Sequence, residues 1–73
     1  MRKAREIREG LNLSLTDVTR KTSIGIGHLA KFERGEAELS HKRAMELVEL
    51  YSRDGHRVTI EELWEEIAPA KAV

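Results

Sequence analysis

The side chains that could support catalysis or bind a metal are few in this sequence. It contains three histidines, His28, His41 and His56, and no cysteine. The histidines lack the close spacing of metal ligands, and no arrangement of serine, histidine and acid typical of a hydrolase is recognisable along the chain. Without cysteine, a thiolate nucleophile, a thiolate metal site and a disulfide are all excluded. We therefore expect a chain that is not an enzyme and that uses no metal or cofactor.

Basic side chains form the more informative set. The net charge of the 73 residues is zero, but residues 1–43 contain ten Lys and Arg against six Asp and Glu, whereas residues 44–73 contain three against seven. The two parts therefore carry charges of +4 and −4. This division predicts that one end of the molecule meets a polyanion while the other end faces away from it.

The elements that would position these side chains are short amphipathic helices. Apolar residues recur at spacings of three and four, and no segment alternates well enough to predict a strand. The expected helices cover about residues 2–9, 15–22, 25–33, 41–51 and 60–67. The fourth helix places Ala44, Leu47, Val48 and Tyr51 on its buried face. The predicted fold class is all-α.

Local capping signals mark most of these helix ends. Ser14 precedes the second helix with Asp17 three residues later, and Thr59 precedes the fifth helix with Glu62 at the same spacing. Both pairs have the pattern of a capping box. Ser40 is the expected N-cap of the fourth helix. The glycines expected to end the first, third and fourth helices are Gly10, Gly35 and Gly55.

A chain of this length forms at most one small domain. We expect residues 1–67 to form that domain and residues 68–73 to be a flexible tail. No apolar run approaches the roughly 18 residues of a membrane span, and the basic start lacks the apolar stretch of a secretion signal. These features predict a cytoplasmic protein with no membrane partner. The methionine at position 1 and the short tail favour a complete small protein.

The connection between the second and third helices is very short and lies around Ser23 and Ile24. Two short helices joined this tightly cannot lie antiparallel and must cross steeply, which is the geometry of a helix-turn-helix. The apolar residues agree with this geometry, because Val18, Ile24, Leu29 and Phe32 would then face one another. The opposite face of the third helix would be left free to enter the major groove of DNA.

Residues 8–36, with the sequence REGLNLSLTDVTRKTSIGIGHLAKFERGE, contain further features of this kind. They are the Arg8–Glu9 pair that ends the first helix, the Leu-Ser start of the second, the apolar Ile24 and the closing Glu33-Arg34-Gly35. In these features the chain resembles the Cro/C1-type (lambda-repressor-like, XRE family) helix-turn-helix domains. The resemblance implies a compact five-helix bundle that binds double-stranded DNA as a homodimer, inserts its third helix into the major groove and regulates transcription as a repressor.

The resemblance also places the residues that would contact DNA. Lys31 on the outward face of the third helix can reach guanine O6 and N7, and Ile26 can contact a thymine methyl group. The expected base contacts are Ile26, Gly27, His28 and Lys31. The expected phosphate contacts are Lys21, Gly25, Arg34, His41, Lys42 and Arg43.

Two further roles concern the frame of the domain. The resemblance implies a partly buried ion pair between Arg8 and Glu33 that orients the third helix. The candidates for a dimer contact are Leu63, Trp64 and Ile67, since a two-fold symmetric operator requires two copies of the reader. Trp64 has an alternative role, because a single tryptophan in so small a domain can also close the core of the monomer.

Four positions depart from the usual pattern of the family, the first being Thr19, where an alanine usually stands midway through the second helix. Leu15 stands where a glutamine usually opens the second helix, Ser23 replaces a turn glycine, and Ile26 replaces a polar outward-facing residue. Leu15, Ile26, Gly27 and the zero net charge favour a second hypothesis, in which the chain keeps the fold but acts as a protein-interaction module, such as an antirepressor or an antitoxin-like partner. The first hypothesis predicts selection of a DNA sequence, and the second predicts a protein partner at Ile26 and Trp64.

Overall fold

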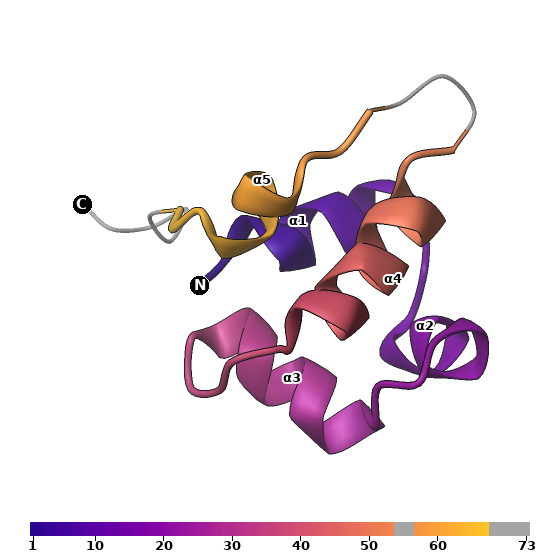
Figure 1. The fold of residues 1–73 in the computed structure, drawn as a ribbon, viewed down its shortest axis with the longest axis horizontal. Helices are drawn as coiled ribbons and strands as arrows, with labels where there is room; N and C mark the ends of the chain where they lie inside the picture. The colour runs from indigo at the N-terminus through magenta and orange to yellow at the C-terminus, as the bar shows by residue number, and fades with distance from the viewer. Residues whose placement is uncertain (54–56, 68–73) are drawn as a thin grey trace.

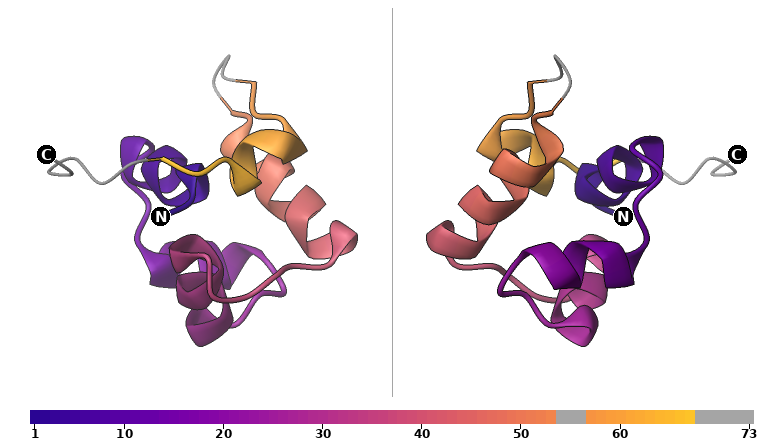
Figure 2. Two further views of the ribbon diagram at one scale, coloured as in Figure 1. Left: turned by 90° about the vertical axis from the view of Figure 1, so that its left-hand side faces the viewer. Right: turned by 90° about the vertical axis from the view of Figure 1, so that its right-hand side faces the viewer.

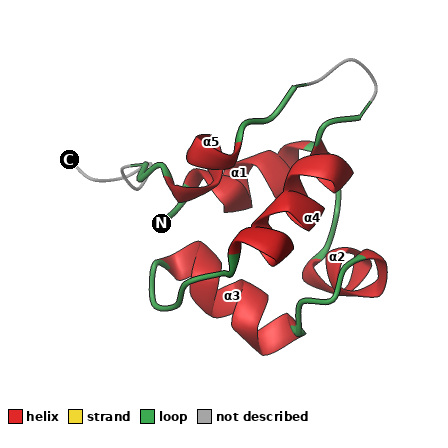
Figure 3. Cartoon of the chain, viewed as in Figure 1, coloured by secondary structure: helices red, strands yellow, loops and turns green. Residues whose placement is uncertain are grey.

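The computed structural model describes residues 1–53 and 57–67. Its helices are α1 (Lys3–Gly10), α2 (Leu15–Lys21), α3 (Ile26–Arg34), α4 (His41–Tyr51) and α5 (Ile60–Trp64) (Figure 1). The described ranges contain no strand (Figure 3), so the fold is all-α, as the sequence predicts. The predicted tail 68–73, the break at Gly55 and the residue His56 lie outside the described residues.

Side-chain caps start three of the helices. Ser14 Oγ accepts the backbone N–H of Asp17 at 3.0 Å, and the Asp17 carboxylate accepts the N–H of Ser14 at 2.9 Å. Thr59 and Glu62 form the same reciprocal pair before α5, and Ser40 caps α4. These contacts confirm the three predicted N-caps. Each joins residues only three positions apart, so the pattern can be recognised in the sequence.

The buried apolar side chains of all five helices form one core. Phe32 and Leu63 are fully buried within it. The other buried apolar residues are Ala4, Val18, Ile24, Leu29, Leu39, Ala44, Leu47, Leu50, Tyr51 and Val58. On α4 the prediction for Val48 is wrong in part, because this residue is half-buried at the edge of the core while Leu50 is buried. The buried stripe of α4 thus widens towards position 50 rather than 48.

The helices are arranged with α2 and α3 at one end of the molecule and α1 and α5 at the other (Figure 1). Helix α4 extends between the two ends, and its first turn points towards the end that holds α2 and α3 (Figure 2). Helix α1 packs against both α5 and α3, and α2 packs against α3. None of the helices in the described part of the chain is both long enough and apolar enough to cross a membrane.

The first residues of the chain pair with the segment that follows α5. The backbone N–H of Lys3 donates to the carbonyl of Glu65 at 2.7 Å, and the N–H of Ile67 donates to the carbonyl of Met1 at 3.0 Å. Glu65 has an extended backbone, so α5 ends at Trp64. The prediction that this helix continues to Ile67 is therefore wrong, because the backbone groups after Trp64 bond to the start of the chain instead.

Candidate nucleic-acid interface

Helices α2 and α3 pack against each other across a connection of residues 22–25. The four apolar residues expected to face one another here, Val18, Ile24, Leu29 and Phe32, are all buried. The only left-handed φ angles in the described ranges are at Asn12 and Gly35. The connection therefore turns without the left-handed residue for which glycine is the usual choice, and serine at position 23 is not strained.

The amino-terminal end of α3 is open to solvent. Its N-cap is Gly25, which offers no side-chain acceptor, so no side chain of the described residues caps the first turn, and its N–H groups can bind an external acceptor. Ile26 is 51% exposed, the largest exposure among the large apolar side chains of the described residues. Gly27 is also exposed, and a Cβ added there would meet nothing within 4 Å. An acceptor such as a phosphate, or the edge of a base, can therefore approach this backbone closely.

Several cations at this end of the molecule form no salt bridge with the described residues, although carboxylates such as Glu46 lie near some of them. Five exposed cations between residues 20 and 43 form no salt bridge with any of the described residues. They are Arg20 and Lys21 on α2, Lys31 on α3, and Lys42 and Arg43 on α4. The cations of α1 differ, since Lys3 pairs with Glu62 and Glu65, and Arg5 pairs with Glu9.

The carboxylates in the same stretch are already engaged by partners. Glu33 accepts two hydrogen bonds from Arg8, Glu36 pairs with Arg34 at 3.1 Å, and Glu38 accepts hydrogen bonds from Arg2 and Trp64. The hydrogen bond from the indole of Trp64, followed by that from Arg2, lowers the pKa of Glu38. All three carboxylates are thus engaged by partners within the chain, and the five cations without a salt bridge to a described residue face solvent.

A buried ion pair ties α3 to α1. Arg8 donates from Nε and Nη2 to the two carboxylate oxygens of Glu33 at 2.8 and 3.1 Å, and from Nη1 to the carbonyl of Leu13 at 2.8 Å. The two side chains are only 9% and 3% exposed. A bidentate geometry of this kind fixes orientation as well as distance. These are the residues for which the family resemblance implies an ion pair, and the pair holds the carboxyl-terminal half of α3 in place.

Two of the predicted DNA contacts are occupied by partners within the chain. His28 Nε2 lies 2.7 Å from the carbonyl oxygen of Glu38, and because a carbonyl only accepts, Nε2 must carry the hydrogen. Only Nδ1 of His28 is then left for a base or a phosphate. Arg34 is exposed but donates from Nε and Nη2 to Glu36, so a phosphate would have to compete with this surface ion pair. The remaining predicted contacts, Lys21, Gly25, Ile26, Gly27, Lys31, His41, Lys42 and Arg43, are exposed.

The residues suggested for a dimer contact lie at the opposite end of the molecule and differ in accessibility. Leu63 is 0% exposed, so the prediction for this residue is wrong, because its whole surface is used inside the monomer. Trp64 packs edge-on against Phe32 with a ring-centroid distance of 5.0 Å, and its indole N–H donates to Glu38 at 2.6 Å. Trp64 therefore closes the core of the monomer. Ile67 is half-buried beside the start of the chain.

The sequence reasoning missed two residues at this end of the molecule. Arg20 is exposed and lines, with Lys21, an open groove that also contains Glu46. Its signal is a second basic residue in the last turn of α2, a position that equally suits the helix dipole. Glu46 of α4 accepts two hydrogen bonds from Ser23, a contact between residues 23 positions apart. No local sequence pattern predicts this contact between Glu46 and Ser23.

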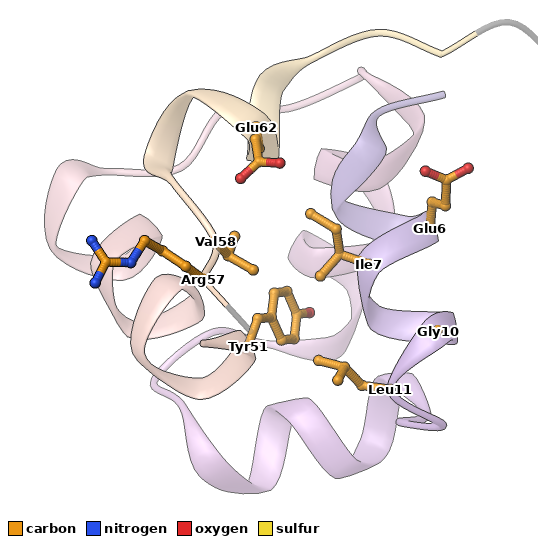
Figure 4. Close-up of a pocket in the computed structure, with 8 residues that line it drawn as sticks. All are labelled: Glu6, Ile7, Gly10, Leu11, Tyr51, Arg57, Val58 and Glu62. Carbon is orange, nitrogen blue, oxygen red and sulfur yellow. The ribbon is translucent and has the colours of Figure 1, made fainter. Parts of the chain in front are cut away.

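A separate cavity of about 300 Å³ lies at the other end of the molecule, between α1 and the segment that enters α5 (Figure 4). Its lining residues are Glu6, Ile7, Gly10, Leu11, Tyr51, Arg57, Val58 and Glu62. Burial raises the pKa of Tyr51, so this phenol stays neutral and cannot serve as a base. No group of three His, Cys, Asp or Glu side chains in the described residues is placed to hold a metal ion.

The chain was also compared with known proteins. Neither the family models, nor the curated proteins, nor the solved structures contain a match to it.

Proposed function

We propose that this protein is a sequence-specific double-stranded DNA-binding regulator of transcription, in which α2 and α3 form a helix-turn-helix. In this proposal the five helices are a lambda-repressor-like bundle, and α3 enters the major groove of DNA. The packing of α2 on α3 and the open amino-terminal end of α3 support this assignment. The chain acts by binding rather than by catalysis, and it works in the cytoplasm.

The observation that carries the proposal is the set of five cations on α2, α3 and α4 that form no salt bridge within the described part of the chain. Proteins normally mix both signs of charge over their surfaces, whereas here five cations between residues 20 and 43 have no salt bridge to a described residue, and the carboxylates of the same stretch, Glu33, Glu36 and Glu38, are engaged. Phosphate oxygens are the polyanion that such a surface suits best, and they supply most of the affinity of DNA-binding proteins. Protein partners with acidic surfaces would not need the open helix end beside these cations.

Within this surface the residues divide into those that read bases and those that bind phosphates. Ile26 would contact a thymine methyl group, Gly27 would allow close approach, and Lys31 would donate to guanine O6 and N7. The proposed phosphate contacts are Arg20, Lys21, Gly25, His41, Lys42 and Arg43. Two roles are secondary, since His28 retains only Nδ1 and Arg34 must leave Glu36.

We further propose that two copies bind one operator and repress transcription. A two-fold symmetric pair reads two half-sites separated by one helical turn, about 34–36 Å. With Leu63 excluded, Trp64 and Ile67 retain partly exposed surface for the contact between copies.

Selection from a pool of random duplex DNA tests the proposal directly. The folded chain should enrich an inverted repeat at physiological salt, and the enriched duplex then serves in anisotropy titrations. Lys31→Ala should weaken binding to that duplex by about 1–3 kcal/mol because a base contact is lost. Arg57→Ala removes one exposed positive charge at the other end of the molecule and is the control, with little change expected.

The protein-interaction module is the second candidate. The exposed Ile26 favours it, because an apolar side chain at 51% exposure beside cations also suits a protein partner. Failure of the folded chain to enrich any DNA sequence would overturn the first proposal and support this one. A retained affinity of Lys31→Ala for an enriched duplex would instead remove α3 as the reader.

A further inference from the structure

A carboxylate from α4 holds the turn between α2 and α3. Glu46 Oε1 accepts the backbone N–H of Ser23 at 2.6 Å, and Oε2 accepts the hydroxyl of Ser23 at 2.8 Å. Ser23 lies two residues before Gly25, the N-cap of α3. Because both carboxylate oxygens are used on one residue, the contact fixes the direction as well as the position of the peptide that leads into α3.

The other hydrogen bonds of this turn stay within α2, the turn itself and the first turn of α3. The hydroxyl of Thr22 donates to the carbonyl of Val18 at 2.9 Å, and the N–H of Ile24 donates to Thr22 Oγ1 at 3.3 Å. Among the hydrogen bonds of the described residues, those from Ser23 to Glu46 are the ones that join residues 22–25 to α4. Apart from core packing, the position of the turn relative to α4 therefore depends on Glu46.

Helix α4 also supplies two of the proposed phosphate contacts, Lys42 and Arg43, one turn before Glu46. The Glu46 carboxylate is thus bonded to the turn that leads into α3, and it lies close to the two cations that would bind phosphates of the DNA backbone. The hydrogen bond from the Ser23 amide lowers the pKa of Glu46, and the charges of Lys42 and Arg43 add to that effect. Glu46 therefore remains an anion, with its negative charge directed into the turn.

We propose that Glu46 is a positioning residue for DNA recognition, which sets the start of α3 relative to Lys42 and Arg43. While Glu46 holds the turn, α3 contacts base edges and Lys42 and Arg43 contact phosphates in one fixed register. With the turn released, the cations still attract DNA, but α3 no longer enters the groove at a fixed depth. The inference rests on the function proposed above. It predicts that Glu46 governs discrimination between sequences rather than attraction to DNA in general.

Three variants separate this role from simple charge effects. Glu46→Ala removes both hydrogen bonds and one negative charge. Glu49→Ala is the matched control, because Glu49 is exposed on the same helix, lines the same groove and has no hydrogen bond or salt bridge to any described residue. Glu46→Gln is the rescue, since its amide can still accept the Ser23 N–H and can donate to the Ser23 hydroxyl, without the charge.

The measurement is the ratio of affinities for the selected duplex and for a random duplex, taken by anisotropy under conditions where thermal unfolding shows each variant to be folded. Glu46→Ala should lower this ratio about tenfold, a size usual for residues coupled through one hydrogen-bond network. Glu49→Ala and Glu46→Gln should leave the ratio near that of the unchanged chain. A purely structural contact would alter the melting temperature without altering this ratio.

Amide hydrogen exchange of Ser23 provides a second readout that needs no DNA. Exchange should accelerate in Glu46→Ala and stay slow in Glu49→Ala and Glu46→Gln. Ser23→Ala, which keeps the backbone bond and loses the hydroxyl bond, should give a smaller fall in the affinity ratio and serves if Glu46→Ala does not fold.

The outcomes are distinguishable. If the unchanged chain selects a sequence but Glu46→Ala and Ser23→Ala keep its affinity ratio, the inference about Glu46 is overturned and the proposed function stands. If the unchanged chain selects no sequence, the proposed function fails and the inference fails with it.

Discussion

Tyr51 is the residue whose chemistry fits its surroundings least well. The side chain is 0% exposed, and its hydroxyl has no hydrogen-bond partner among residues 1–53 and 57–67. Burial raises the pKa of this phenol, and the nearby charge of Glu33 acts in the same direction. The hydroxyl is therefore a neutral, desolvated donor, and a group of this kind costs stability unless it is bonded.

Replacing Tyr51 by phenylalanine should consequently not destabilise the fold. The free energy of unfolding should stay equal or rise by about 1 kcal/mol, because an unpaired buried hydroxyl is removed while the ring is kept. Urea unfolding followed by circular dichroism measures the change. Tyr51→Leu is the control that removes the ring and should be clearly less stable than Tyr51→Phe. A loss of stability in Tyr51→Phe would show that the hydroxyl has a bonded partner, such as an internal water.

Helix α3 has a carboxyl-terminal end that is held by other parts of the fold and an amino-terminal end that is open to solvent. Its carboxyl-terminal half is held by the Arg8–Glu33 pair and ends at Gly35, whose φ of +85° closes the helix in the left-handed region. Its amino-terminal end has a glycine cap and a second glycine at position 27. Glycine inside a helix lowers stability relative to alanine. Glycine at position 27 therefore lowers the stability of the end of α3 that is proposed to contact DNA.

Gly27→Ala should separate stability from function. An added methyl group meets nothing within 4 Å, so the variant should gain about 0.5–1 kcal/mol in free energy of unfolding. If backbone at this position lies against DNA, the same methyl group should weaken binding to the selected duplex. Gly10→Ala is the matched control, because its added Cβ also meets nothing within 4 Å and α1 lies away from the proposed interface. Equal affinities of the two variants would rule out close approach at Gly27.

The helices themselves were largely predictable, because their signals are local. Ser14, Ser40 and Thr59 each act on an amide three residues away, and such contacts can be read along the chain. The end of α5 was not predictable, because the residues after Trp64 pair with the start of the chain. The contact of Glu46 with Ser23 was also invisible in the sequence, since only the packed fold brings these residues together.

The sequence predicts the charged residues of the candidate site but not their hydrogen-bond partners within the chain. The sequence indicates which residues are basic and which end of the chain holds them. It does not indicate that His28 donates to the carbonyl of Glu38, or that Arg34 is held by Glu36. Both contacts depend on the path of the loop after α3. The burial of Leu63 likewise depends on how α5 lies against the core, because an apolar residue in a short helix is equally compatible with an interface.

For the whole molecule, the separation of charge predicts how binding responds to salt. Lys42→Ala combined with Arg43→Ala should reduce the slope of log affinity against log salt by about two units, since each phosphate contact contributes about 0.9. Titrations at several salt concentrations measure the slope. Arg5→Ala combined with Arg57→Ala removes two positive charges that are not in the proposed interface and should leave the slope nearly unchanged. Equal slopes for the two double variants would mean that α4 does not meet the DNA backbone.

Acid should lower the stability of the whole molecule, because several carboxylates accept hydrogen bonds in the folded chain. Folding lowers the pKa of Asp17 through the N–H of Ser14, of Glu46 through the N–H of Ser23, and of Glu62 through the N–H of Thr59. The unfolded chain therefore binds more protons than the folded chain as the pH falls.

The resulting stabilisation is fully present above the ordinary Glu pKa of 4.5 and is lost as the pH falls through the lowered values of the folded chain. Urea unfolding at a series of pH values should show this decline. Glu62→Gln should make the decline shallower, and Glu49→Gln should not. A free energy of unfolding that stays constant through this acid range would contradict the hydrogen bonds assigned to the three carboxylates.

The contacts of Glu38 give the chain an optical property. Trp64 is the only tryptophan, and its indole N–H donates to the Glu38 carboxylate, while the carbonyl of the same residue receives His28 from α3. Indole emission responds to the polarity and charge at its N–H. A ligand that moves α3 or the loop after it should therefore alter the emission of Trp64, so that binding by the unlabelled protein can be followed by its own fluorescence.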